Sequence, residues 1–150
     1  MPETFKQFID TSSYCLIINH EIQPARYHYL MGIRGVRGAT QVKENSVAEI
    51  GQAVAELLSK MLEENHVDTS DLVSIIFTAT VDLTADFPAV AARSIGLGDV
   101  PLLCAVEIDV PESLPRVVRI LMHLNSDKSL SEIKHIYLNG ASVLRKDLAQ

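Results

Sequence analysis

Arginines in apolar surroundings are the residues of this chain with the clearest chemical potential. A planar guanidinium can hold a carboxylate through two parallel hydrogen bonds, whereas an unpaired buried charge is costly. Arg119 is the most informative, because it stands in the middle of the apolar segment 117–121. It needs either a structural ion pair with Glu107 or Asp109, or an anionic ligand, and the residues leave both alternatives open. The arginines in or beside apolar segments are Arg37, Arg93, Arg119 and Arg145.

A glycine-rich segment, residues 31–40, contains two arginines three positions apart. Side chains alternate between the two faces of a strand, so Arg34 and Arg37 point in opposite directions and at most one enters a given pocket. Gly35 and Gly38 leave space beside Arg37 for a ligand to approach the backbone. The alternative interpretation is an edge strand with two solvated arginines.

Cys104 and Glu107 lie in and just after the apolar run 102–106. In a regular strand they point to opposite faces, so a shared site requires the strand to bend or end between them. By itself, Cys104 has the character of a small buried apolar residue. The sequence shows no Cys-His or Ser-His-Asp signature, and its glycines match no phosphate-binding loop. Covalent catalysis is therefore poorly supported.

Composition narrows the possible ligands. The 150 residues are 47% hydrophobic and carry a formal net charge of -6, with a pI near 5.3. This acidity argues against nonspecific nucleic-acid binding but permits a locally positive pocket for a small anion. No apolar run reaches the ~18 residues that cross a bilayer, and the two cysteines and five histidines form no disulfide framework or metal-ligand spacing. We expect a cytoplasmic protein with no metal and no membrane or nucleic-acid partner.

One long helix must support this chemistry, and its apolar spacing places it at residues 44–65. Ser46 followed by Glu49 fits a capping box, and Asn65 is a plausible stop. The apolar stripe predicts a helix that packs one face on a sheet. Its members are Val47, Ile50, Val54, Leu57, Leu58, Met61 and Leu62.

Strands and a short helix fill the rest of the chain. Pro88 suits the first position of a short helix that ends near Gly96. Asn139-Gly140 is a strong two-residue hairpin signal between segments 135–138 and 141–144. We predict an α+β fold with one mixed sheet of about five strands and the long helix on one face. The other strands are predicted at residues 31–40, 72–79, 100–106 and 116–124.

Residues 1–30 are mixed and weakly periodic, and Met31 opens the first strand pattern. We expect a poorly ordered N-terminal extension, 1–30, before a single domain at 31–150. Met31 is a candidate for the natural start, which agrees with an extension, and the alternative is a short extra element packed on the domain.

From residue 31 to residue 148 the chain resembles the AroH-class chorismate mutases, which are monofunctional trimeric enzymes. Each shared motif is weak alone, but together they occur in the family's order and at compatible spacing. The motifs are GIRGVRGAT at 32–40, TATVDL at 78–83, FPA at 87–89 with Arg93, VPLLC at 100–104, EIDV at 107–110, Arg119, HIYL at 135–138, LR at 144–145 and DL at 147–148.

The resemblance implies a homotrimeric pseudo-barrel with active sites between subunits and no cofactor. It implies rearrangement of the dianion chorismate to prephenate, on the route to phenylalanine and tyrosine. By resemblance, Arg119 donates to the ether oxygen and a carboxylate, Arg37 holds a carboxylate and Tyr137 donates a hydrogen bond. Glu107 and Cys104 meet the ring-hydroxyl side. The implied wall and mouth of the site are Phe87, Ala89, Arg93, Leu103, Leu144 and Arg145.

Three positions depart from the family pattern. Val90 stands where members can carry a lysine, Leu103 where a threonine is known, and Lys146 where a proline is common. These departures bear on substrate affinity more than on the type of reaction. The alternatives are a trimeric imine/enamine deaminase of similar architecture and a non-catalytic sensor of an anionic metabolite.

Overall fold

The computed structural model describes residues 17–18, 21–22 and 31–145. The chain divides into two units, 1–30 and 31–150. In the first unit, the described residues form two short antiparallel strands, β1 (Ile17–Ile18) and β2 (Glu21–Ile22). The rest of segment 1–30, for which poor order was predicted, and Lys146, the third departure from the family pattern, lie outside the described residues.

A mixed five-stranded sheet forms the second unit, with strand order β5-β4-β6-β3-β7. The inner pairs β3–β6 and β4–β6 are antiparallel, whereas the outer pairs β4–β5 and β3–β7 are parallel. This arrangement confirms the predicted α+β class. It also excludes an edge position for the strand of Arg37, because β3 lies between β6 and β7. The strands are β3 (Gly32–Gln41), β4 (Leu72–Ala79), β5 (Leu102–Val106), β6 (Val117–Ser126) and β7 (Ile136–Leu138).

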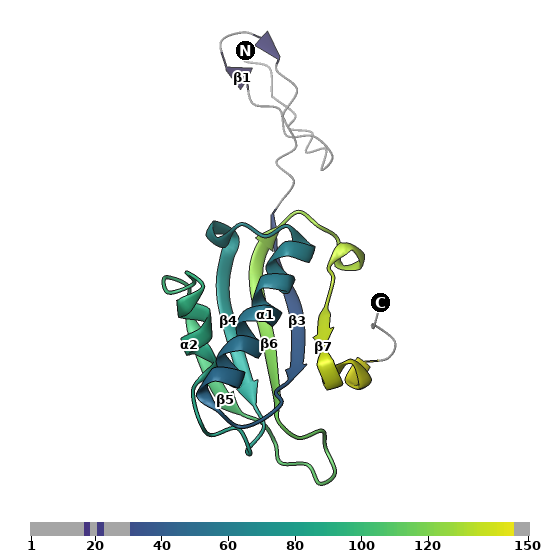
Figure 1. Cartoon of the computed structure of the whole chain (residues 1–150). Helices are drawn as coiled ribbons and strands as arrows, with labels where there is room; N and C mark the ends of the chain where they lie inside the picture. Colours follow the sequence, from purple (N-terminus) through teal and green to yellow (C-terminus); the bar gives the residue numbers. More distant parts are fainter. Residues whose placement is uncertain (1–16, 19–20, 23–30, 146–150) are drawn as a thin grey trace, which may run out of the picture. The chain divides into compact units, whose positions relative to one another are not determined.

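Two helices pack against each other and cover one face of this sheet, as Figure 1 shows. α1 (Val47–Asn65) lies along the sheet, and α2 (Pro88–Ser94) lies over β4 and β5. Three 3-10 turns complete the unit: η1 (Thr69–Asp71), η2 (Leu130–Glu132) and η3 (Asn139–Arg145). In the described part of the chain, no α-helix covers the opposite face. We call this second face the open face.

Local signals set the ends of α1 close to the predicted positions. The Ser46 hydroxyl accepts a hydrogen bond from the Glu49 backbone N–H, so the helix begins at Val47, three residues later than predicted. It ends at Asn65, as predicted, because His66 adopts the left-handed conformation that stops a helix. The stripe is buried as expected except for Leu62, which is partly buried, and Val47, which is exposed.

Strand alternation divides β6 between the two faces. Its core-side residues, Val118, Ile120, Met122 and Leu124, are buried beneath the helices. Arg119, Leu121 and His123 therefore project from the open face. The strand places a cation on this face without interrupting the hydrophobic core.

The predicted hairpin at Asn139-Gly140 is wrong. β7 is an edge strand that pairs in parallel with β3, and the chain then turns directly into η3. A two-residue type I′ turn needs a positive φ at both central residues, but only Asn139 of the pair has one, at 53°. The Asn139 amide instead donates to Thr40 Oγ1 at 3.0 Å, and Ala141 is fully buried.

The missing side chain of Gly38 makes room for helix α1 and not, as predicted, for a ligand. A Cβ at this position would overlap Met61 Sδ and lie 3.2 Å from Leu57 Cδ1, both on α1. We expect Gly38→Ala to lower the free energy of unfolding by about 1–3 kcal/mol, because the buried methionine must move. Urea unfolding measures the change, with Gly35→Ala as the control, since its Cβ makes only an ordinary 3.5 Å contact with Leu121. Equal effects of the two substitutions would contradict this explanation.

Candidate active site

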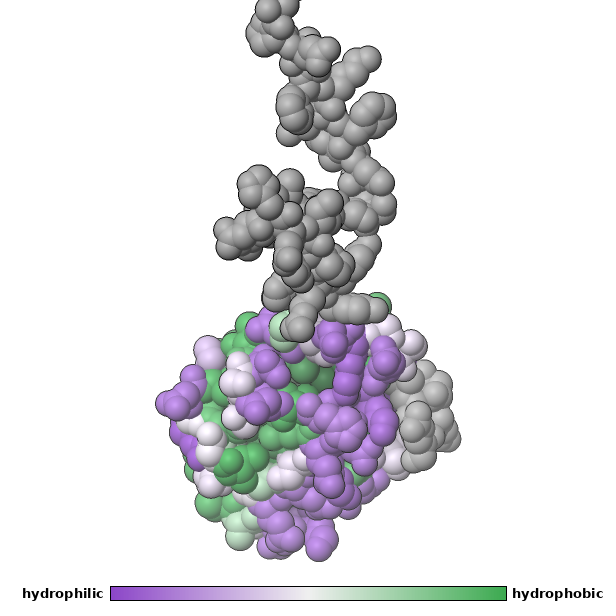
Figure 2. Space-filling model, turned by 90° about the horizontal axis from the view of Figure 1, so that it is seen from above, coloured by the Kyte–Doolittle hydropathy of each residue, from purple (hydrophilic) through white to green (hydrophobic). Residues whose placement is uncertain are grey.

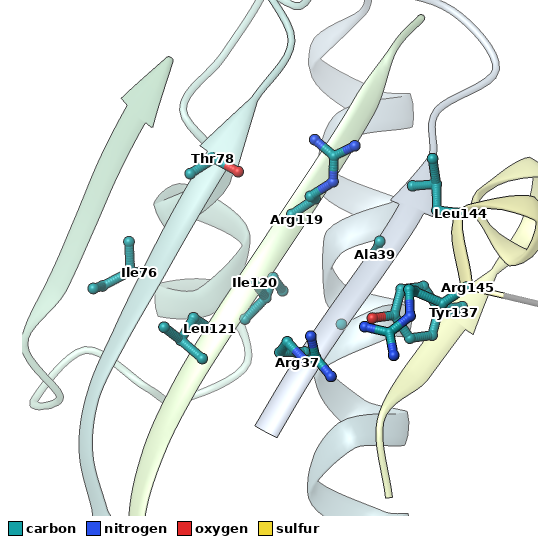
Figure 3. Close-up of a pocket in the computed structure, with 11 residues that line it drawn as sticks. Arg37, Ala39, Ile76, Thr78, Arg119, Ile120, Leu121, Tyr137, Leu144 and Arg145 are labelled. Carbon is teal, nitrogen blue, oxygen red and sulfur yellow. The ribbon is translucent and has the colours of Figure 1, made fainter. Parts of the chain in front are cut away.

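Strand register brings polar and charged residues together on the open face. Arg119 of β6 lies opposite Thr78 of β4 on one side and opposite Ala39 of β3 on the other. Ala39 in turn lies opposite Tyr137 of β7. Figure 3 shows these side chains around one cavity of about 450 Å³. The cavity is lined by Arg37, Gly38, Ala39, Ile76, Thr78, Arg119, Ile120, Leu121, Tyr137, Leu144 and Arg145.

The two arginines of β3 separate as their spacing predicts. Arg37 lines the cavity, where Figure 3 shows it on the same side as Tyr137 and Arg145. Arg34 is on the other face and donates from Nε to the Lys128 carbonyl oxygen at 2.5 Å. Arg34 therefore has a structural contact, and Arg37 is the one available to a ligand in this cavity.

Glu107, just after β5, contacts two of the residues that line this cavity. Its backbone N–H donates to the Ala79 carbonyl at 2.9 Å, which extends the β4–β5 pairing by one residue. One carboxylate oxygen, Oε1, accepts from the Thr78 hydroxyl at 2.6 Å, and the other pairs with Arg119 Nη1. Both oxygens of this carboxylate are thus held by protein groups.

The Glu107–Arg119 contact answers the choice that the sequence left open for Arg119. The structural ion pair exists, and its partner is Glu107. However, the Glu107 side chain is only 11% exposed, whereas that of Arg119 is 42% exposed. A guanidinium has five N–H donors, and the ion pair uses Nη1. Arg119 therefore retains donors for an anionic ligand, so the two alternatives are compatible.

Positive charge dominates the cavity, because three arginines line it. The same charge affects His135, which is half-buried just before β7. Burial and then the neighbouring Arg37 and Arg145 guanidinium groups lower the pKa of His135 from its usual 6.5. The Arg37 backbone N–H donates to His135 Nδ1 at 3.1 Å, a contact that requires this nitrogen to be unprotonated. A neutral His135 therefore fixes the backbone at Arg37.

His135→Asn tests this electrostatic environment. Because folding lowers the pKa of His135, the unfolded chain binds its proton more readily, and stability falls as pH decreases through 6.5 toward the folded value. Asparagine keeps a short acceptor but does not titrate. We expect the variant to lose less unfolding free energy than the unmodified protein between about pH 7.5 and pH 5.5. Parallel urea titrations at several pH values measure this difference, and identical pH slopes would contradict it.

The remaining predicted site residues do not reach this cavity within one chain. Cys104 points toward the helices and packs against the core, on the opposite face from Glu107, as a regular strand requires. Phe87 and Cys104 line a second cavity of about 390 Å³, formed by the loop after β4 and by β5. The other predicted residues are close in sequence to Phe87 or Cys104. Ala89 is buried in α2, Arg93 is exposed on α2 and Leu103 is exposed on β5.

The sequence did not predict a site role for two residues beside the arginines of the cavity, Thr78 and His135. Thr78 carried a usable signal, because it shares a strand face with Ile76 one position before β4 ends. His135 contacts Arg37 across 98 positions of sequence, which no local pattern reveals.

Among the described residues, no group of three or more His, Cys, Asp or Glu side chains could hold a metal ion. No helix in the described part of the chain is long and apolar enough to span a membrane.

Comparisons with known proteins agree with one another. The family model for chorismate mutase type I matches residues 33–148. Chorismate mutase AroH of Thermus thermophilus is 50% identical over 117 residues, which cover 77% of this chain and 96% of that protein. Chorismate mutase AroH of Bacillus subtilis (strain 168) is 42% identical over 120 residues, 79% of this chain and 94% of that protein. A solved chorismate mutase from Clostridium thermocellum is 49% identical, with a TM-score of 0.72, and the match covers 73% of this chain and 98% of that one.

Proposed function

Because this chain belongs to the type I chorismate mutase family, and is therefore an isomerase of aromatic amino acid biosynthesis, we propose that it rearranges chorismate to prephenate in the cavity around Arg119. One observation supports this location above all. Three arginines line a cavity on an acidic protein, and chorismate is a dianion. Arg37 and Arg145 lie on one side of this cavity, and Arg119 lies on a neighbouring strand (Figure 3).

The proposed mechanism relies on positioning and electrostatics. The rearrangement is intramolecular, so it requires no acid, base or nucleophile. The enzyme must hold the compact conformer of chorismate, in which the atoms that will bond lie close together. Arg37 binds a substrate carboxylate, and Tyr137 adds a hydrogen bond. Arg119 binds the second carboxylate and the ether oxygen, which gains negative charge as its C–O bond lengthens.

Glu107 complements the arginines with a negative charge. The ring of the substrate gains positive character while the ether oxygen gains negative character. A carboxylate near the ring side stabilises the first change, and Glu107 also orients Arg119, which stabilises the second. The Glu107–Arg119 pair thus presents opposite charges to the two separating fragments.

We further propose that each complete site is built by two subunits of a homotrimer. The second group of family site residues, which includes Phe87 and Cys104, lies at a cavity other than that of Arg119 in the same chain. Phe87 is 70% exposed and Leu103 is 59% exposed, although both are apolar. On the face of the molecule that it draws, Figure 2 shows hydrophobic residues beside a broad hydrophilic area. Covering one subunit's Arg119 cavity with the Phe87 region of the next would bury the exposed Phe87 and Leu103 side chains and complete the site.

Two departures from the family pattern bear on affinity. Val90 is an exposed apolar residue on α2, close in sequence to Arg93, so this part of the mouth has less positive charge than a lysine would give. Leu103 removes a hydroxyl but keeps its backbone groups. We propose weaker substrate capture with an unchanged reaction type. The cytoplasmic location, the absence of nucleic-acid partners and the extension 1–30 stay predictions.

A rigid bicyclic dicarboxylate that mimics the compact conformer tests the proposed site. An enzyme complementary to the transition state binds such a mimic more tightly than its substrate. We expect competitive inhibition with an inhibition constant well below the KM for chorismate. Hydrolysis of enamines without any loss of chorismate would favour the deaminase alternative. Tight binding of chorismate without conversion would favour the sensor.

A further inference from the structure

We propose that Thr78 is a positioning residue that keeps the Glu107–Arg119 ion pair from closing over both carboxylate oxygens, so that Arg119 donors stay available to the substrate. This inference rests on the proposed function of the cavity. Thr78 lines the same cavity as Arg119 and contacts Glu107, but it has no place in the chemistry described above.

The position of Thr78 in the sheet gives its hydroxyl a fixed direction. Thr78 lies between Ala105 of β5 and Arg119 of β6 in the strand register. As a β-branched residue in a strand, it has few accessible side-chain rotamers. Its hydroxyl donates to Glu107 Oε1 at 2.6 Å, which is the short distance of a hydrogen bond to a charged acceptor.

Glu107 has more freedom and depends on such a contact. It lies beyond the last residue of β5, and its side chain has three rotatable bonds. An arginine and a carboxylate tend to pair through two parallel hydrogen bonds when nothing prevents it. Here Arg119 Nη1 pairs with Oε2, while Thr78 occupies Oε1. Thr78 therefore fixes the rotation of the carboxylate, because turning Oε1 toward Arg119 would stretch or break its hydrogen bond to the Thr78 hydroxyl.

The difference in exposure of the ion pair agrees with this role. Glu107 lies mostly covered, while Arg119 is substantially exposed. The carboxylate is thus mostly covered by protein, whereas the guanidinium lines the cavity and keeps exposed surface. A bidentate pair would draw the guanidinium toward Glu107 and use a second of its N–H donors. Thr78 fixes the carboxylate in the orientation that leaves the second donor available.

Thr78→Val tests the proposal, because valine has nearly the same shape but no hydroxyl. We expect kcat for chorismate to fall on the order of tenfold, as for loss of a hydrogen bond to a charged group. KM should change much less, because Arg37 and Tyr137 still bind the substrate. Thr78→Ser restores a hydroxyl and should return kcat to within about twofold of the unmodified protein. Ser74→Ala is the matched control, since Ser74 lies on the same strand and its hydroxyl contacts His123 at 3.0 Å, outside the cavity.

A double-mutant cycle with Glu107→Gln identifies the residue through which Thr78 acts. If Thr78 acts by orienting Glu107, Thr78→Val should have little further effect on kcat in the Glu107→Gln background. An equal loss in both backgrounds, or normal kcat in Thr78→Val, would overturn this inference alone. Normal turnover in Glu107→Gln would overturn the proposed role of the ion pair and the inference with it. Circular dichroism and thermal unfolding of each variant establish that it is folded.

Discussion

Arg119→Ala is expected to lower kcat for chorismate by about 100-fold or more, which is the usual effect of losing a donor aimed at transition-state charge. Arg119 projects from the open face of β6 into the cavity, so alanine removes donors from the ligand without opening the core. Alanine leaves the mostly covered Glu107 carboxylate without its arginine, although Thr78 still donates to that carboxylate, so some loss of stability accompanies the change. The loss of turnover should nevertheless exceed the loss of stability.

Two further arginine variants make this result specific. Arg119→Lys keeps a positive charge but loses the planar fork, so we expect an intermediate kcat. Arg34→Ala is the control, because Arg34 lies on the opposite face of β3 and donates to the Lys128 carbonyl. It should retain near-normal kcat even though it also removes one positive charge. A folded Arg119→Ala enzyme with near-normal kcat would contradict the role of Arg119.

Active-site complementation is expected to restore activity when two inactive variants are combined. Arg119→Ala disables the cavity on the open face, and Phe87→Asp places a negative charge in the exposed second region, where it would repel a dianion. If each site uses one region from each of two subunits, mixed trimers contain sites in which both regions are intact. Random mixing of equal amounts should give about a quarter of the unmodified activity.

The complementation test needs proof that the subunits have mixed. The two variants carry different affinity tags and are refolded together, and recovery through both tags in sequence isolates mixed oligomers. Each variant refolded alone should stay inactive. Mixed oligomers without activity would contradict a site shared between subunits, and so would full activity of the Phe87→Asp variant alone.

The regular parts of the fold were predictable because their residues follow one periodicity. α1 needed only its apolar spacing and Ser46, and β4 was predicted at its observed bounds. The opposite directions of Arg34 and Arg37 followed from strand alternation alone. In each case a local rule and the packed structure agree.

The errors arose where distant residues decide the local structure. Asn139-Gly140 has the composition of a tight hairpin turn, but pairing of β7 with β3 and burial of Ala141 favour a 3-10 turn. Gly38 was attributed to ligand approach, whereas its neighbour is Met61 of α1. Parallel pairing and helix-to-sheet packing depend on residues that are far apart in sequence, so periodicity cannot supply them.

The candidate site was predictable only in part, because strand alternation is a local rule whereas the contacts between strands join residues far apart in sequence. Alternation correctly separated Cys104 from Glu107, which raised the question of how they share a site. Only the register shows that Thr78 lies beside Arg119 and holds Glu107. The role of His135 likewise depends on the approach of Arg37 from another strand.

The most direct measurement of the central claim is the conversion of chorismate by the purified full-length protein, with identification of the product by NMR. The loss of chorismate should match the formation of prephenate mole for mole, and the Arg119→Ala variant assayed beside it should produce far less. Folded protein that leaves chorismate unchanged, or that converts it to another product, would contradict the account.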